Sequence, residues 1–152
     1  MKLLFAVKNV AAHAEEMGEA APPEPVFFQK PASCLQEGPE LSLPEDIGPI
    51  EYEVELAVQV EKPLSRATPE AARNAMGKVG IVLDLTAREL QAQRKKAGLP
   101  WYEAKGFDGA CVLGPLVELG ELEDELEALA PTLHVNGEAR QGFSVADYRY
   151  AP

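Results

Sequence analysis

A chain of 152 residues suits one domain and is long enough to bury a hydrophobic core. Its formal net charge of −11 would repel phosphate backbones and anionic lipid, so we expect neither nucleic acid nor a membrane as a partner. No apolar run approaches transmembrane length, and the run Leu3–Val7 is shorter than the core of a secretory signal. We therefore expect a cytoplasmic protein.

The N-terminal part begins with a predicted strand at Leu3–Val7, followed by a short helix that Asn9 would open. The stretch "GEAAPPEPVFFQKPAS" contains four prolines and must be extended or turning, and such arms often border sites. Beyond it, Cys34 and Cys111 each lack a second Cys or His at metal-binding spacing. We expect two buried free thiols.

The stretch "IEYEVELAVQV", Ile50 to Val60, predicts a long strand. Its apolar residues alternate as a buried face should, so Glu51, Glu53 and Glu55 share the opposite face. Carboxylates two residues apart on a strand lie about 6.8 Å from one another and repel if that face is even partly desolvated. This arrangement has two interpretations, an ordinary exposed strand face or a group of acids that needs a cation.

Two helices are predicted after this strand. Thr68 suits the N-cap and Pro69 the first position of a short helix that ends near Gly77. Further on, "GIVLDLTARELQAQRKKAGLP" reads as a strand that leads into a helix, with Thr86 and Glu89 spaced as a capping box. The glycine and proline of "GLP" would end that second helix.

The last third of the chain shows two further patterns. Leucines in "LGELEDELEALA" recur at roughly helical spacing with acids between them, which predicts a surface helix from about Glu121. In "TLHVNGEARQ" the pair Asn136-Gly137 is a strong hairpin signal. Short helices among dominant strands indicate an α+β or mostly-β domain.

Asp84 favours the metal interpretation of the acidic strand. A carboxylate near the end of the apolar stretch "IVLDL" is not explained by hydrophobic patterning. Together with two glutamates of the strand at Ile50–Val60 it would supply three oxygen ligands. Oxygen ligands without nearby His or Cys favour Mg²⁺ or Mn²⁺, with positions left for water or substrate. Such an open coordination site is typical of catalytic metals.

Three further polar features carry weight only in combination. His13 and Glu16 are three residues apart and would form a base with its orienting carboxylate on one helix face, although such pairs are usually surface contacts. Lys30 lies on the proline-rich arm and Lys105 in the glycine-containing "EAKGFDG". Each lysine alone is more often a solvated side chain.

The combination resembles the fumarylacetoacetate hydrolase family, most closely its bacterial branch of acylpyruvase-like and 5-carboxymethyl-2-hydroxymuconate isomerase-like proteins. The segments that carry the resemblance are "YEVELAV", "LDLTARELQ", "KKAGLPWYEAKGFD" and "VNGEARQG". The resemblance implies that Glu53, Glu55 and Asp84 bind Mg²⁺ or Mn²⁺. Glu51 is a neighbour that the family pattern does not require.

The same resemblance assigns roles to other polar residues. His13 and Glu16, in "NVAAHAEEMG", match the catalytic pair of the family, and Lys30 in "FQKP" matches a catalytic lysine. The substrate-binding residues that it implies are Arg88, Gln91 and Lys105. The family's Ser beside the last lysine is Gly106 here.

The implied activity is metal-dependent hydrolysis of the carbon–carbon bond of an acylpyruvate, a small keto-acid substrate, through a metal-stabilised enolate. Related members isomerise a hydroxymuconate-type diacid or decarboxylate oxaloacetate, and these activities are the alternative. The implied fold is the family's mostly-β roll, here a single domain over 1–152, with an N-terminal segment and arm at 1–40 and a core at 41–152. Family members are commonly homodimers.

The family fold continues past this chain to a Gly-Thr-Pro-x-Gly-Val-Gly loop. We therefore expect a roll that is incomplete at its C-terminus. A non-catalytic metal-binding remnant, or a subunit that needs a partner, is the second alternative.

Overall fold

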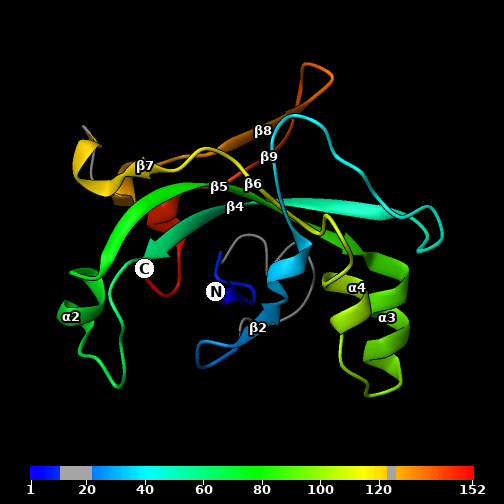
Figure 1. The fold of residues 1–152 in the computed structure, drawn as a ribbon, viewed down its shortest axis with the longest axis horizontal. Helices are drawn as coiled ribbons and strands as arrows, with labels where there is room; N and C mark the ends of the chain where they lie inside the picture. The colour runs from blue at the N-terminus through cyan, green and yellow to red at the C-terminus, as the bar shows by residue number, and fades with distance from the viewer. Residues whose placement is uncertain (11–21, 123–125) are drawn as a thin grey trace. The chain divides into compact units, whose positions relative to one another are not determined.

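The computed structural model describes residues 1–10, 22–122 and 126–152. Strands outweigh helices, which confirms the mostly-β α+β fold (Figure 1). The strands are β1 Leu3–Ala6, β2 Phe27–Lys30, β3 Leu35–Glu37, β4 Ile50–Val60, β5 Met76–Ala87, β6 Cys111–Leu113, β7 Val117–Glu118, β8 Thr132–Val135 and β9 Glu138–Gly142. The α-helices described are α2 Pro69–Arg73, α3 Arg88–Lys96 and α4 Tyr102–Lys105.

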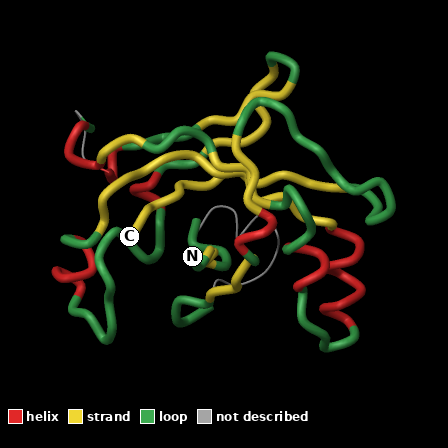
Figure 2. The backbone as a smooth tube through the Cα atoms, in the orientation of Figure 1, coloured by secondary structure: helices red, strands yellow, loops and turns green. Residues whose placement is uncertain are grey.

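The central sheet has the strand order β3-β6-β5-β4, and β7 also pairs with β5. Its two longest strands, β4 and β5, are the long yellow stretches of the tube in Figure 2. Strand β6 lies antiparallel to β5 and parallel to β3, with Asp84 opposite Cys111 in the β5–β6 register. This pairing surrounds the end of β5 with neighbouring strands, so polar side chains there are buried.

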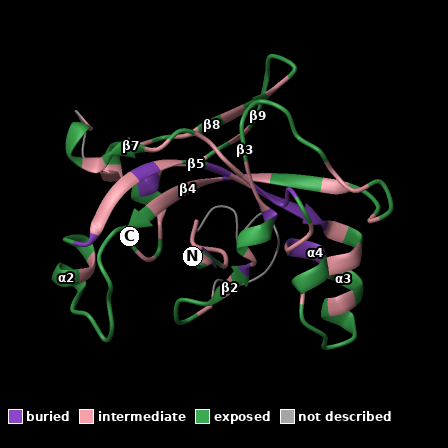
Figure 3. Cartoon of the chain, viewed as in Figure 1, coloured by how far each residue is buried: buried purple, intermediate pink, exposed green. Residues whose placement is uncertain are grey.

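The chain divides into two compact units, and β4 and β5 each contribute residues to both units. The first unit comprises residues 1–7, 26–55 and 82–114. It contains the antiparallel pair β1–β2, the strands β3 and β6, the second half of β5, and the helices α3 and α4, which pack on each other. Buried segments gather at the end of β5 and in α4 (Figure 3). All the site residues described below belong to this unit.

The second unit is built from described parts of 8–25 together with 56–81 and 115–152. It holds α2, β7 and the antiparallel hairpin β8–β9. The side chain of Asn9 makes two hydrogen bonds to the backbone of Tyr150, near the C-terminus. Its amide donates to the Tyr150 carbonyl over 2.9 Å, and its amide oxygen accepts the Tyr150 N–H over 3.0 Å. These bonds attach residues of the N-terminal segment to the last residues of the chain.

The acidic strand has the predicted limits, but its two faces differ from the prediction. Val54 is buried as expected, whereas Tyr52 is 41% exposed and Val60 is 55% exposed. On the opposite face Glu53 and Glu55 are half-buried. Burial along β4 thus follows position rather than face: the middle of the strand is covered on both faces, and its exposed residues lie toward the two ends.

The predicted helix ends were partly right. Thr68 caps α2, since its side chain accepts the Ala71 N–H over 3.2 Å. The capping box was wrong, because Thr86 lies in β5 and α3 begins only at Arg88, with no side-chain cap. A capping residue must stand next to the first helical turn, and here the strand continues through that position. Helix α3 ends before Gly98, which has the positive φ of 67° expected at this site.

The leucine pattern near Glu121 was also misread. Its described residues form two separate 3₁₀ turns, Leu119–Glu121 and Leu126–Ala128, in place of an α-helix there. By contrast, the hairpin prediction is confirmed: Asn136 and Gly137 have φ angles of 54° and 84° and connect β8 to β9. Within the described ranges, no helix has the length and hydrophobicity to span a membrane.

Candidate metal centre

Three carboxylates meet in the first compact unit. Glu53 and Glu55 come from one face of β4, and Asp84 comes from β5. One carboxylate oxygen of each lies within 4.8 Å of the others. We call these three residues the acid trio. The sequence alone does not show this arrangement, because Asp84 lies beside the glutamates only through the pairing of β4 with β5.

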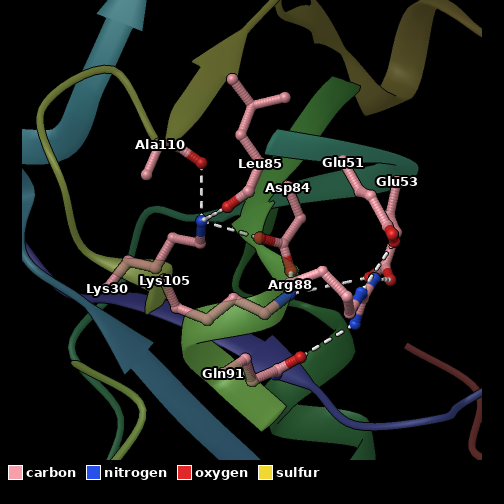
Figure 4. A network of polar contacts seen from close by, with 9 residues as sticks. All are labelled: Lys30, Glu51, Glu53, Asp84, Leu85, Arg88, Gln91, Lys105 and Ala110. Atoms are coloured by element: carbon pink, nitrogen blue, oxygen red, sulfur yellow. Dashed lines mark hydrogen bonds and ion pairs between the residues drawn. The ribbon is translucent and has the colours of Figure 1, made fainter. Parts of the chain in front are cut away.

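The carboxylate of Asp84 is enclosed between two lysines (Figure 4). Nζ of Lys30 lies 2.7 Å from Oδ1, and Nζ of Lys105 donates to Oδ2 over 2.6 Å. Both lysines are buried as well. Two buried ammonium groups thus face the two oxygens of one buried carboxylate.

Lys30 and Lys105 otherwise have different surroundings. Lys30 also donates to the backbone carbonyls of Leu85, over 3.0 Å, and Ala110, over 2.6 Å. Lys105 extends toward Glu53, with 3.7 Å between Nζ and Oε2, and lies 5.1 Å from the ring centre of Phe28. Both lysines thus lie over an aromatic ring, since Lys30 is 5.3 Å from the ring centre of Phe5, but Lys30 bonds to the strand backbone while Lys105 faces a second carboxylate.

Arg88 joins two acids of β4. Its Nε donates to Glu51 over 2.7 Å, and its Nη2 donates to Glu53 over 2.5 Å. Its Nη1 donates to the side-chain oxygen Oε1 of Gln91 over 2.9 Å (Figure 4). Arg88 and Gln91 are three residues apart on α3, so they lie on one face of the helix. Burial would lower the pKa of Arg88, but the bonds to the two glutamates raise it overall. The predicted substrate-binding pair thus contacts the acidic strand.

Glu55 differs from its two partners in the trio. Among the described residues we find no ion pair to its carboxylate, and burial, followed by repulsion from Asp84 and Glu53, raises its pKa to about 8. A carboxyl with such a pKa holds its proton at neutral pH unless a positive charge arrives. The site therefore has one acid that the neighbouring lysines and arginine do not hold in its ionised form at neutral pH.

The acid trio fits a small divalent cation. One carboxylate oxygen from each of the three residues lies within 4.8 Å of the others, and hard divalent cations take carboxylate oxygens as ligands. Oxygen-only ligands favour Mg²⁺ or Mn²⁺, and such a cation would displace the proton of Glu55. Glu53, Glu55 and Asp84 would hold the cation.

An apolar pocket of about 360 Å³ lies next to these residues. The wall of the pocket includes the aromatic residues Phe28, Trp101 and Tyr102, and Lys105 lines it too. The ring centres of Phe28 and Trp101 are 6.4 Å apart. Lys105 thus belongs both to the pocket wall and to the polar network around Asp84. Sequence reasoning missed this pocket, since aromatic residues in "VFF" and "PWY" look like ordinary core residues.

Two predicted catalytic residues have no structural test here. His13 and Glu16 lie outside the described residues, and their roles stay predictions. The structure brings the remaining predicted site residues together in one unit: Lys30, Glu53, Glu55, Asp84, Arg88, Gln91 and Lys105. Contacts alone do not assign chemical roles to them. Glu51, which had no assigned role, contacts Arg88.

Comparison with known proteins identifies related chains. Residues 2–152 match the family model "Fumarylacetoacetate (FAA) hydrolase C-terminal". An oxaloacetate tautomerase of Escherichia coli (strain K12) is 42% identical over 147 residues, which are 96% of this chain and 67% of that protein. A mitochondrial oxaloacetate tautomerase of Arabidopsis thaliana is 39% identical over 142 residues, with 92% and 63% covered.

A solved structure adds a bound metal. The crystal structure of fumarylpyruvate hydrolase from Pseudomonas aeruginosa, in complex with Mn²⁺ and pyruvate, has a TM-score of 0.88 and 31% sequence identity to this chain. The match covers 97% of this chain and 66% of that one. The chain thus spans about two thirds of the length of these three relatives. A divalent metal in one of them agrees with the chemistry of the acid trio.

Proposed function

This chain belongs to the fumarylacetoacetate hydrolase family. We propose that it contains the metal-binding site of an enzyme that interconverts the keto and enol forms of oxaloacetate. Both curated relatives described above are oxaloacetate tautomerases, and they match the isomerase alternative better than carbon–carbon hydrolysis. The observation that carries the proposal is the acid trio, placed between basic side chains that suit a dianionic keto acid.

The reaction moves one proton and shifts one double bond from the keto C=O to the adjacent C–C bond. The proton leaves the methylene carbon beside the keto group and a proton is delivered to the keto oxygen, so atoms and charge balance. A Mg²⁺ or Mn²⁺ bound by the trio would supply Lewis acidity toward the keto oxygen. Lys105 contributes an ammonium that faces the same region and stabilises negative charge on oxygen.

Arg88 and Gln91 would bind the substrate from the side of α3. The guanidinium of Arg88 is fixed by two glutamates, which orients its remaining N–H groups. The base that takes the carbon-bound proton is still a prediction, with His13 oriented by Glu16 as the candidate.

A spectroscopic assay tests this proposal. Oxaloacetate in its enol form is diluted into buffer with the purified chain, and the decay of the enol absorbance is followed with Mn²⁺ and then with excess chelator. We expect faster decay than with Mn²⁺ alone, and loss of the acceleration in chelator. The control is Glu53→Gln/Glu55→Gln, which keeps the shape of both side chains. A wild-type rate equal to that of this double variant would refute the proposal.

Hydrolysis of acylpyruvates is the second candidate, and the apolar pocket favours it. The acetyl group of acetylpyruvate has no charge, and the wall of Phe28, Trp101 and Tyr102 would accept it while the keto-acid end meets the trio. Oxaloacetate has a carboxylate at that end, which an apolar wall disfavours. Parallel assays with acetylpyruvate and oxaloacetate, at the same Mn²⁺ concentration, separate the two activities by their ratio of kcat/KM.

A further inference from the structure

Lys30 is fully buried, and its ammonium is surrounded by protein oxygens. Three lie within 3.0 Å of Nζ: the Leu85 carbonyl, the Ala110 carbonyl and Oδ1 of Asp84. The two carbonyls accept hydrogen bonds from the ammonium and Asp84 is its ion-pair partner, so these three oxygens enclose Nζ. A substrate oxygen would have to displace one of these oxygens and would have to reach a residue with no exposed surface.

The partners of Lys30 also hold the local strand pairing. Lys30 is the last residue of β2, Leu85 belongs to β5, and Ala110 immediately precedes β6. The Ala110 carbonyl also accepts the Leu85 N–H over 3.0 Å. One ammonium thus bonds to the backbone on both sides of the β5–β6 pairing and to the carboxylate of Asp84 in the same pairing (Figure 4).

Lys105 contacts the other oxygen of Asp84, and its surroundings are open on one side. It reaches toward Glu53 and lines the apolar pocket. Two cations on the same carboxylate therefore differ in access: one is enclosed by backbone, and the other adjoins a cavity in which a ligand has room.

We propose that Lys30 is a positioning residue, which holds Asp84 in the orientation that binds the cation, while Lys105 keeps the substrate-binding role that the resemblance to the family implied. The resemblance to the family gave Lys30 a catalytic role, and its contacts favour this other one. The Lys105 half rests on the proposed function. The Lys30 half concerns cation binding alone, so a binding measurement tests it whether or not the chain has any turnover.

The first experiment compares Lys30→Met with Lys105→Met, which remove the same charge and keep a similar length. Mn²⁺ affinity is measured by calorimetry. We expect Lys30→Met to weaken binding at least tenfold, as loss of a group that orients a metal ligand does, and Lys105→Met to stay within threefold of wild type or bind more tightly. Wild-type Mn²⁺ affinity in a folded Lys30→Met variant would overturn the positioning role.

Turnover supplies a second readout. In Lys30→Met the lost rate should return as Mn²⁺ is raised toward saturation, whereas in Lys105→Met it should stay low at saturating Mn²⁺. A Lys30→Met rate that stays low at saturation would overturn the division between the two lysines. If wild type has no turnover with oxaloacetate or acetylpyruvate, the proposed function fails, and the affinity comparison still decides the role of Lys30.

A measurement on the unmodified chain covers the case in which Lys30→Met does not fold. Lysine ammonium groups labelled with ¹⁵N are observed by NMR, with the signal of Lys105 assigned from its absence in Lys105→Met. We expect a second, exchange-protected ammonium signal from Lys30 that stays in place when Mg²⁺ and then pyruvate are added, while the Lys105 signal shifts on addition of pyruvate. A pyruvate-induced shift of the protected signal as large as that of Lys105 would contradict the proposal.

Discussion

Arg88 and Glu53 form an ion pair of 2.5 Å, and the same guanidinium holds Glu51 at 2.7 Å. One arginine of α3 therefore joins two acids on one face of β4, of which Glu53 belongs to the acid trio and Glu51 does not. The third acid on this face, Glu55, has no such cation among the described residues and carries a raised pKa. Three acids that look equivalent in the sequence thus have three different environments.

The different environments predict different effects of the same substitution. Glu53→Gln should lower Mn²⁺ affinity at least tenfold, because it removes a ligand charge from the trio. Glu51→Gln is the matched control on the same strand face. It loses one ion pair of a largely exposed side chain, so it should change unfolding free energy by less than about 1 kcal/mol and Mn²⁺ affinity by less than threefold. Calorimetric titration and urea unfolding measure both, and equal losses of affinity would count against the trio.

Cation binding should release a proton from Glu55. When no cation is bound its pKa is about 8, so at pH 7 the carboxyl is mostly protonated, and a metal ligand must be deprotonated. The apparent Mn²⁺ affinity should therefore rise with pH up to about 8 and level off above it. Calorimetry at pH 7 in buffers of different ionisation enthalpy should show release of nearly one proton per Mn²⁺.

Glu55→Gln provides the control for that measurement, since it has no proton to lose. It should abolish the buffer dependence and weaken Mn²⁺ binding. The same heat in every buffer for the wild-type chain would show that Glu55 is already ionised before the cation arrives, contrary to the expectation.

The two cysteines should be unreactive in the folded chain. Burial raises the pKa of Cys34, and burial together with the nearby Cys34 thiol raises that of Cys111 to about 12. The nucleophile is the thiolate, which is disfavoured at pH 8 in both sites. A thiol-specific chromogenic disulfide should react slowly with native protein and rapidly after unfolding in urea. Rapid labelling of native protein would contradict this expectation.

Two threonines offer a matched test of helix capping. Thr68→Val should destabilise the chain by about 1 kcal/mol, because Thr68 caps α2 with its hydroxyl. Thr86→Val should be neutral or stabilising, since the buried Thr86 hydroxyl finds no hydrogen-bond partner among the described residues. Urea unfolding measures both, and a larger loss for Thr86→Val would restore the capping role that the sequence pattern predicted.

The sequence was most informative where a local rule decides the structure. The alternation over Ile50–Val60 predicted the limits of β4, and Asn136-Gly137 predicted the β8–β9 hairpin, because a two-residue turn with positive φ angles needs such residues. Proline at the first helical position placed the start of α2. Each of these signals acts within a few residues.

Local patterns failed where a neighbour in space changes the outcome. Thr86 has the spacing of a capping residue, but pairing in the sheet extends β5 past it. The leucines after Leu119 have helical spacing, yet their described residues form 3₁₀ turns. Tyr52 alternates as a core residue would but is 41% exposed, whereas Val54 on the same face is 3% exposed, because only the middle of β4 is covered.

For the candidate site, the chain by itself supplied the residue types. Acids on alternate strand positions, an aspartate inside an apolar strand and the linked family motifs were enough to name the trio, the arginine and the lysines. Only the tertiary structure decided what each one contacts, because strand register and side-chain burial depend on segments up to 80 residues apart. That is why Lys30 and Lys105, similar in the sequence, differ in the fold: backbone carbonyls enclose the first, and an apolar pocket adjoins the second.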